Sequence, residues 1–451
     1  MAARVNACPP SDNLVVGYHR IQRLGGHMGR LGRRAPLLAV MLLASVGLAC
    51  SPSEPRSSPP AAAVWLQLGP DGTRLARAIT TASTCPAARF DDAALTLTER
   101  AAPGPAYGVR TCEAVVAPQV RRVTVAGQEI PNPAGPPQRI AVLGDTGCRL
   151  KKVDGFQACN DPQQWPFARI AQSVARYQPD LIIDVGDYLY REEACPTGNT
   201  GCAGSPWGQN WDTWNADFFA PAAPALTAAP WVFVRGDHES CARAGDGWFR
   251  FLEPRPMTAC TDMTAPYTIP VGSLRLLMMD TVNANDTTPD PTAVQTYAEQ
   301  FRALGSDAGE NAWLLSHRPL WGLVPDPSGA MKLSVVNATL EQAARDTLPA
   351  GVQLVLTGHV HLAEVLDFSG ARPPQMIAGI GGTLLLPEIG ENVVGMTVDD
   401  ATLTAATLTA EHGFITLEPQ QDGWTATIRN TDGAPQPTAQ CHLEHQQATC
   451  T

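Results

Sequence analysis

The sequence predicts an α/β fold with a small β-rich domain near its N-terminal end, and two patterns predict it. From about residue 138 onward, short and almost continuous apolar runs end in polar residues and are separated by helical or loop segments. Such runs are typical of strands that are buried on both faces of a sheet. Between residues 64 and 130, apolar and polar residues alternate, as in strands that bury only one face.

The composition supports a folded chain and excludes one broad class of function. The chain has 451 residues, of which 44% are hydrophobic and 17% charged, enough apolar material for a buried core. Its formal net charge is −11, so it lacks the positive charge with which general nucleic-acid-binding proteins hold phosphates. We therefore expect no specific nucleic-acid partner.

The first 50 residues are interpreted as a signal and lipoprotein segment. Arginines between residues 30 and 34 precede an apolar run over 36–49, which is too short for a typical membrane-spanning helix and suits a signal peptide. The run ends in Gly-Leu-Ala-Cys, which resembles a bacterial lipoprotein cleavage box with Cys50 as the lipidated residue. The alternative is ordinary cleavage near residues 61–63, with Cys50 lost. Met28 is an alternative start of translation.

Residues 51–63 read as a flexible tether rich in Ser, Pro and Ala. Together with the lipidation site, the tether predicts an exported protein held at a membrane by a lipid anchor, in the periplasm or at the cell surface of a bacterium. The oligomeric state is not readable from these features.

The cysteines agree with export. The chain has 12 cysteines, and ten remain when Cys8 and Cys50 are set aside. An even set in an exported chain predicts disulfides. The sequence does not determine which cysteines pair. The simplest pairing joins nearest neighbours, namely 85–112, 148–159, 195–202, 241–260 and 441–450. Thiolate metal binding is the alternative, although no Cys-x-x-Cys pair is present.

Two folded domains are predicted after the tether. The first is the small β-rich domain over residues 64–135, stapled by Cys85 and Cys112. The second covers residues 136–451 and ends in a β-hairpin, in which alternating runs at 414–417 and 424–428 flank a Gln-Asp-Gly turn.

Metal-binding residue types follow five of the apolar runs in the second domain. Polar residues directly after the carboxyl ends of strands are where open α/β folds place their sites. A single Asp or His in such a place is more often a turn or structural residue, so the ordered set carries the argument. The set consists of Asp145; Asp187 and Tyr190; Asp237 and His238; His317; and His359 and His361.

These residues stand in the motifs GDTG, GDYLY, GDHE, LLSH and GHVH. In this order they resemble the calcineurin-like metallophosphoesterases and, within them, the purple acid phosphatase pattern, over about residues 138–395. The resemblance implies a four-layer αββα metallophosphatase sandwich for the second domain. One departure from the pattern lies at a predicted metal ligand, because Asp237 stands where the pattern usually has Asn.

The resemblance also implies a centre of two metal ions bridged by Asp187. One ion would be bound by Asp145, Asp187, Tyr190 and His361, and the other by Asp187, Asp237, His317 and His359. Carboxylate, imidazole and phenolate ligands suit hard or borderline cations, and the pair expected is Fe(III) with Zn(II), Mn(II) or Fe(II). A phenolate bound to ferric iron gives the visible absorption band that colours the family.

The implied activity is hydrolysis of a small phosphate ester by attack of a metal-bound hydroxide. A phosphomonoesterase is expected first. The alternatives are a phosphodiesterase of the same fold and a catalytically degenerate metal-binding surface protein. His238 is expected to contact the phosphate or to protonate the leaving oxygen. Arg318 either contacts the phosphate or is a solvated surface arginine.

Asp237 should change the charge of the second metal position. A carboxylate in place of an amide adds one negative charge, which should hold a hard cation more tightly and lower its Lewis acidity. The alternative is that Asp237 is protonated or turned away, or that a neighbouring group compensates for the added charge.

Cys50 is expected to carry the lipid that holds the protein at the membrane. Cys50→Ser should therefore release the protein into the soluble fraction or leave its precursor uncleaved, and fractionation with mass analysis of the mature N-terminus measures both. A Cys50→Ser protein that matures and fractionates like the wild type would show that cleavage lies elsewhere.

Overall fold

The computed structural model describes residues 61–325, 337–389 and 392–450. The predicted signal segment, Cys50 and most of the tether lie outside these residues. No helix within the described ranges is long and apolar enough to cross a membrane.

Two large sheets dominate the described part of the chain. The first has eleven strands, which in spatial order are β25 (Gln447–Cys450), β24 (Pro435–Glu444), β23 (Gly423–Asn430), β22 (Gly413–Gln420), β9 (Ile140–Leu143), β12 (Leu181–Asp184), β13 (Trp231–Phe233), β1 (Ala63–Leu68), β2 (Arg74–Thr80), β6 (Arg110–Val116) and β5 (Thr98–Ala101). The second has eight strands, β14 (Tyr267–Val271), β15 (Leu274–Met278), β16 (Ala312–Leu315), β17 (Val352–Thr357), β19 (Gln375–Ala378), β18 (Ala363–Phe368), β21 (Ala401–Thr409) and β20 (Thr397–Val398).

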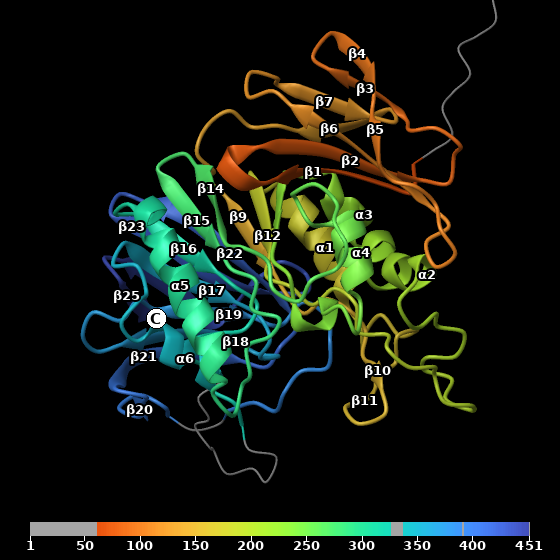
Figure 1. Ribbon diagram of the computed structural model, residues 1–451. Coiled ribbons are helices and arrows are strands. Elements are labelled where there is room, and N and C mark those ends of the chain that lie inside the picture. The colour runs from red at the N-terminus through yellow and green to blue at the C-terminus, as the bar shows by residue number, and fades with distance from the viewer. Residues whose placement is uncertain (1–60, 326–336, 390–391, 451) are drawn as a thin grey trace, which may run out of the picture. The chain divides into compact units, whose positions relative to one another are not determined.

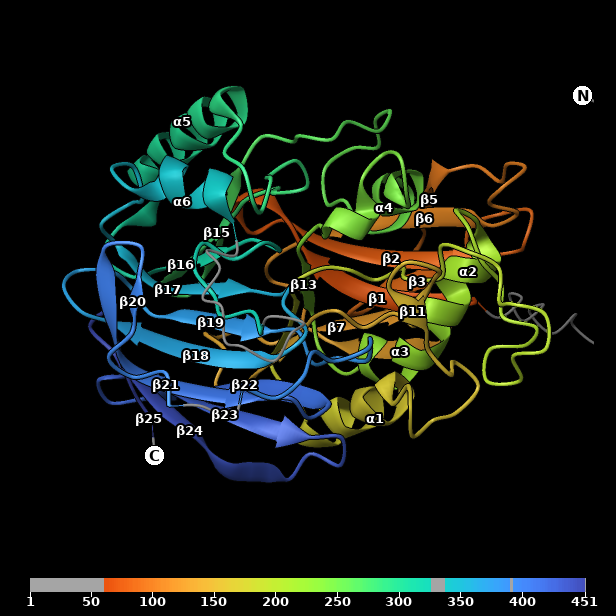
Figure 2. The same ribbon diagram turned by 90° about the horizontal axis from the view of Figure 1, so that it is seen from below.

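Helices cover the outer face of each sheet. The longer helices of the described chain are α1 (Phe167–Tyr177), α3 (Ala220–Leu226), α4 (Gly245–Phe251), α5 (Pro291–Ala308) and α6 (Ala338–Ala344), and α2 is a short turn at Trp211–Trp214. Figures 1 and 2 show α1, α3 and α4 on one side of the paired sheets and α5 and α6 on the other. This arrangement is the predicted four-layer αββα sandwich.

The continuous apolar runs arise because both faces of the central strands are buried. In β9, Ile140 and Val142 pack into the core between the sheets, whereas Ala141 and Leu143 pack under the helices. Successive side chains of a strand point to opposite faces, so a strand between two cores has no polar position. The strands β9, β12 and β13 run parallel, as do β15, β16, β17 and β19, which places their carboxyl ends at a common edge of each sheet.

The β-rich segment over residues 64–135 is present and extends the first sheet. Its strand β1 pairs in parallel with β13 through Gln67 and Trp231, and β2, β6 and β5 continue outward from it. A separate four-stranded sheet holds β4 (Ala93–Thr96), β3 (Ala87–Phe90), β7 (Arg122–Val125) and β8 (Gln128–Pro131). Whether this segment folds as a domain of its own stays a prediction.

The C-terminal hairpin is also present, as β22 and β23. β22 pairs antiparallel with β9, where Ile415 faces Val142. The chain then adds β24 and β25, two further strands at the edge of the sheet that the sequence pattern did not indicate.

All ten cysteines of the predicted set form the nearest-neighbour disulfides. The bonds are Cys85–Cys112, Cys148–Cys159, Cys195–Cys202, Cys241–Cys260 and Cys441–Cys450. This pairing is compatible with an exported protein and leaves none of these thiols for metal binding.

The buried Glu364 on β18 should make stability depend on pH. Its Oε2 accepts the backbone N–H of Leu323 at 3.0 Å, and burial raises its pKa from 4.5 to about 8. Between pH 4.5 and pH 8, the carboxyl group of Glu364 keeps its proton in the folded protein and has lost it in the unfolded chain. The contribution of Glu364 to stability is therefore lost as the pH rises through this window, by up to ~1.4 kcal/mol per pH unit.

Glu364→Gln should remove this contribution and stabilise the protein near pH 8 relative to the wild type. Urea unfolding of both proteins at pH 5.5 and pH 8 measures the difference, and comparing them cancels the titration of all other groups. Equal pH dependence in the two proteins would show that Glu364 is ionised in the folded state.

Candidate metal centre

The structure brings all seven predicted metal ligands together where the two sheets meet. The first sheet contributes four of them from the loops after β9, β12 and β13, namely Asp145, Asp187, Tyr190 and Asp237. The second sheet contributes three from the loops after β16 and β17, namely His317, His359 and His361. The common strand direction in each sheet is the reason that these distant residues converge.

The first group of ligands surrounds the hydroxyl of Tyr190. That oxygen lies 2.8 Å from Asp145 Oδ1, 2.9 Å from Asp187 Oδ2 and 3.0 Å from His361 Nε2. Tyr190 is fully buried. Burial and the two carboxylates raise the pKa of Tyr190 well above its usual value, so its hydroxyl keeps its proton unless a bound cation stabilises the phenolate.

The second group begins at the same oxygen of Asp187. His317 Nε2 lies 3.1 Å from Asp187 Oδ2 and 3.4 Å from Asp237 Oδ1. His359 Nδ1 lies 3.0 Å from Asp237 Oδ1. The four side chains offer ligand atoms within 4.8 Å of one another. Because Asp187 Oδ2 belongs to both groups, it is the atom that would bridge two bound ions.

The polar atoms of the second group fit a metal ion. Asp237 Oδ1 and His317 Nε2 are buried, and neither has a hydrogen-bond partner within the described ranges. His317 Nδ1 lies 2.8 Å from the carbonyl oxygen of Val185, to which it can only donate. Nδ1 therefore carries a proton, and Nε2, which faces the carboxylates, is the nitrogen that an ion would bind.

The backbone holds two of the three carboxylates, Asp187 and Asp145, by their second oxygens. The N–H of His238 donates to Asp187 Oδ1 at 2.9 Å, and the N–H of His359 donates to Asp145 Oδ2 at 3.0 Å. Asp145, Asp187 and His359 adopt positive φ angles of 56°, 63° and 72°. Such left-handed conformations are uncommon outside glycine and concentrate at functional sites.

Two motif glycines make this close packing feasible. A Cβ atom on Gly236 would lie 2.1 Å from Asp187 Oδ1, and one on Gly358 would lie 2.6 Å from Asp145 Oδ2. Both distances are well below van der Waals contact, so any side chain here would displace a ligand.

Glu239 shapes the loop that carries Asp187 and Tyr190, although the sequence assigned it no role. Its Oε2 accepts the N–H groups of Gly236 and Asp187 at 3.1 and 3.2 Å. Its Oε1 accepts those of Tyr188 and Leu189 at 3.0 and 3.2 Å. One buried side chain thus replaces the hydrogen bonds that this tight loop cannot make internally.

Asp237 carries its charge next to two arginines. Arg243 Nη1 lies 2.8 Å and Arg318 Nη2 3.3 Å from Asp237 Oδ2. Burial works to raise the pKa of Asp237, but the charge of Arg318 and the close contacts with His317 and His359 outweigh burial and hold this pKa well below its usual value. Asp237 is therefore ionised and faces the site, and neighbours compensate for the charge that the usual Asn lacks.

Arg318 lies in the site and is not a solvated surface arginine. Its side chain is only 12% exposed. Besides Asp237 it pairs with Asp286, whose Oδ2 lies 3.1 Å from His359 Nε2. Arg243 and Asp286 were missed at the level of sequence because neither belongs to a motif, and only the fold brings them to the ligands.

His238 lies beside the ligands without joining them. Its Nδ1 lies 2.8 Å from Glu192 Oε1 and 3.1 Å from the carbonyl oxygen of Leu189. Its Nε2 lies 3.8 Å from the bridging oxygen of Asp187. The acceptors on Nδ1 fix the ring so that Nε2 faces the centre.

Comparisons with known proteins agree with this geometry. A family model for calcineurin-like phosphoesterases matches residues 138–363. A purple acid phosphatase, PPD1 from yellow lupin (Lupinus luteus) seeds, has a similar structure with a TM-score of 0.52 and 14% identity, over 83% of this chain and 72% of that one. PhoD is similar with a TM-score of 0.53 and 12% identity, over 89% and 93% of the two chains. A search of curated protein sequences found no match.

The chain belongs to the calcineurin-like phosphoesterase family. The predicted family and the predicted four-layer α/β architecture are thereby confirmed, and the class of activity is that of a metal-dependent phosphoric ester hydrolase.

The pairing of Asp237 with arginine predicts a coupled effect on metal retention. Asp237→Asn removes the carboxylate that Arg243 and Arg318 share beside the second metal position, so metal affinity there should fall at least about tenfold. Adding Arg243→Gln removes one of the two guanidinium charges and should restore part of the loss. Metal content after dialysis against a graded chelator measures both.

Arg169→Gln is the matched control, because Arg169 is an exposed arginine paired with Asp432. It should retain metal like the wild type. Additive effects of Asp237→Asn and Arg243→Gln would contradict the charge compensation described here.

Proposed function

We propose that the protein is a phosphomonoesterase that uses two metal ions held by the seven ligands described above. The observation that carries this proposal is the pair of ligand groups sharing Asp187 Oδ2. When bound, such a pair of ions supplies Lewis-acid stabilisation of the phosphate oxygens and a nucleophile at neutral pH.

Ferric iron is the proposed occupant of the first position, and Zn(II), Mn(II) or Fe(II) that of the second. The burial of Tyr190 among carboxylates supports this choice, because a more highly charged cation stabilises a buried phenolate more strongly. Carboxylate and imidazole at the second position suit a borderline divalent ion.

His238 is the proposed proton donor to the leaving oxygen. Glu192 orients its ring, and Nε2 faces the centre. The proton would pass from Nε2 to the ester oxygen as the bond to phosphorus breaks, and the imidazole would then recover a proton from solvent. A general acid is needed most when the leaving group is a poor one.

The charge around the centre supports a monoester over a diester. Arg318 and Arg243 border the second metal position, and guanidinium groups bind phosphate oxygens through charged hydrogen bonds. A terminal phosphate offers three free oxygens to such donors and carries two negative charges near neutral pH, whereas a diester offers two oxygens and carries one charge, so guanidinium donors at the centre favour the monoester. Arg318 is accordingly proposed to contact the substrate phosphate.

Export and membrane anchoring through Cys50 complete the proposal. The five disulfides support an oxidising compartment. The lipid anchor itself rests on the cleavage box at residues 47–50.

The function is tested by turnover of p-nitrophenyl phosphate against bis-p-nitrophenyl phosphate by metal-loaded protein. The monoester should be preferred. His238→Ala should lower kcat about 10²–10⁴-fold for phenyl phosphate, and much less for p-nitrophenyl phosphate, whose leaving group needs no proton.

His442→Ala serves as control, since His442 lies at the outer hairpin β24 beside Glu444, and it should leave kcat unchanged. A preference for the diester would replace the monoesterase proposal. Absence of turnover in fully metal-loaded protein would favour the degenerate binding protein.

A further inference from the structure

We infer that Arg149 is a substrate-binding residue that takes the phosphate on the Tyr190 side of the centre and selects doubly charged phosphomonoesters. The inference rests on the proposed phosphoesterase function and deepens it. No motif of the sequence pointed to Arg149, which follows the GDTG motif by two positions.

Arg149 touches two of the ligands proposed for the first ion. Its Nη2 lies 3.2 Å from His361 Nε2. The centre of its guanidinium group lies 4.8 Å from the centroid of the Tyr190 ring. The side chain is 12% exposed, so the group reaches the inner ligands and still borders solvent.

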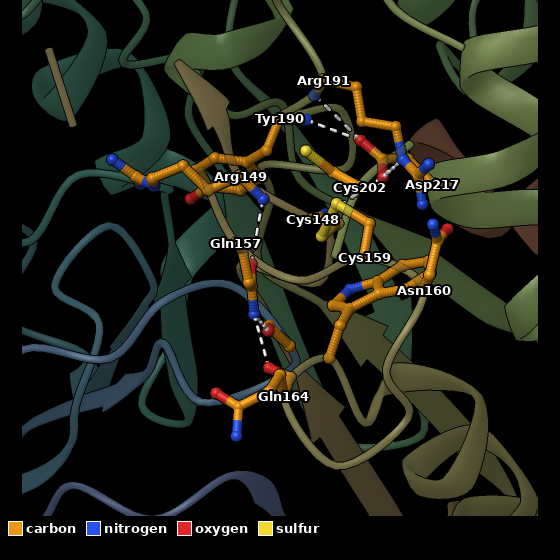
Figure 3. The surroundings of a disulfide bond; sticks show 12 residues. Cys148, Arg149, Gln157, Cys159, Asn160, Gln164, Tyr190, Arg191, Cys202 and Asp217 are labelled. Carbon is orange, nitrogen blue, oxygen red and sulfur yellow. Dashed lines mark hydrogen bonds and ion pairs between the residues drawn. A yellow bond between two sulfur atoms is a disulfide. The ribbon is translucent and has the colours of Figure 1, made fainter. Parts of the chain in front are cut away.

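A network of buried hydrogen bonds holds the backbone of Arg149 in place. Its N–H donates to Gln157 Oε1 at 3.0 Å, and the Gln157 amide donates to the carbonyl oxygen of Gly382 at 2.8 Å. The Cys148–Cys159 disulfide closes this loop. Figure 3 shows Gln157 bonded to the backbone of Arg149 and the arginine side chain extending away from the disulfide.

The same loop is tied to Tyr190. Asp217 Oδ1 accepts the N–H of Cys148 at 3.0 Å, and Asp217 Oδ2 accepts that of Tyr190 at 2.8 Å. Figure 3 shows Asp217 joining these two segments. Arg149 and Tyr190 are therefore fixed relative to each other, as a preorganised binding site requires.

The charge of Arg149 is the least compensated of the three guanidinium groups at the centre. Arg243 is opposed by Glu192 and Asp237, and Arg318 by Asp237 and Asp286. The carboxylate nearest to Arg149 is Asp154, at 3.5 Å and 37% exposed. A long, solvated pair of this kind is weak, so Arg149 keeps charge available for an incoming anion.

Arg149 leaves the ligand atom of His361 free for an ion. Arg149 Nη2 lies 3.5 Å from His361 Nδ1 and 3.2 Å from His361 Nε2, so it lies over the face of the ring and not along the lone pair of Nε2. Nε2 also faces Tyr190 and Asp145 and is proposed to bind the first ion. With an ion bound there, the guanidinium would remain beside it, where a phosphate oxygen at the centre would match its planar fork.

The test compares Arg149→Gln and Arg149→Lys with the wild type in the full, metal-loaded protein. In Arg149→Gln, the KM for p-nitrophenyl phosphate and the Kd for inorganic phosphate, measured by calorimetry, should rise on the order of tenfold to a hundredfold. The kcat/KM ratio of monoester to diester should fall about tenfold, and Arg149→Lys should lie between, because it keeps the charge and loses the fork.

Lys152→Gln is the matched control, because it removes an exposed positive charge from the same turn and should change none of these values. Metal content and the visible band of the iron-loaded protein should be the same in all variants. Loss of metal or of the band with an unchanged Kd for phosphate would overturn the inference and make Arg149 a packing residue for Tyr190. Equal losses for monoester and diester would overturn the selectivity.

The proposed function and this inference fail in different ways. A wild type that turns over no phosphomonoester would remove the monoesterase proposal, whereas the phosphate Kd of Arg149→Gln still decides whether Arg149 binds the anion. If Arg149→Gln does not fold, Arg149→Lys still decides it, because an unchanged phosphate Kd with unchanged selectivity in that variant would overturn the inference.

Discussion

The repulsion among buried anionic ligands is the constraint on which the rest of this structure depends. Asp145, Asp187 and Tyr190 are buried together, and the side chain of Asp237 beside them is only 13% exposed. Such an arrangement is unfavourable without cations, because buried like charges repel strongly in a medium of low polarity. The scaffold therefore has to hold the ligands rigidly. The loops then cannot move apart to relieve the repulsion, and bound cations relieve it instead.

The scaffold meets this demand with backbone hydrogen bonds and disulfides. Glu239 accepts four N–H groups around the Asp187 loop, and backbone N–H groups fix one oxygen each of Asp145 and Asp187. The loops after β9, β12 and β13 are each closed by a disulfide within eight residues of a ligand, at Cys148, Cys195 and Cys241. In an oxidising compartment these bonds limit the conformations that the ligand loops can reach without cations.

The ligands were readable from the sequence because each lies within a few residues of a strand end that the apolar pattern marks. The groups around them were not, because their contacts join segments far apart in the chain. Asp286 reaches His359 across 73 positions, and Asp217 reaches Tyr190 across 27. The pairing of β1 with β13 escaped for the same reason, since alternation marks a strand but does not identify its neighbour. The strands β24 and β25 were missed although each pairs with the strand before it in the chain.

Asp237 shows how such distant contacts change the meaning of a motif. Read alone, a carboxylate in place of the usual Asn makes the second metal position more negative and weakens its attraction for phosphate. In the structure, the oxygen of Asp237 that faces away from the histidines contacts Arg243 and Arg318, so the added negative charge is paired within a few ångströms. Burying an arginine is unfavourable unless its charge is matched. A degenerate site that no longer bound metal would have no reason to keep two largely buried arginines against this carboxylate. The substitution is therefore better explained as one half of a compensated pair in a working metal centre than as a step towards losing it.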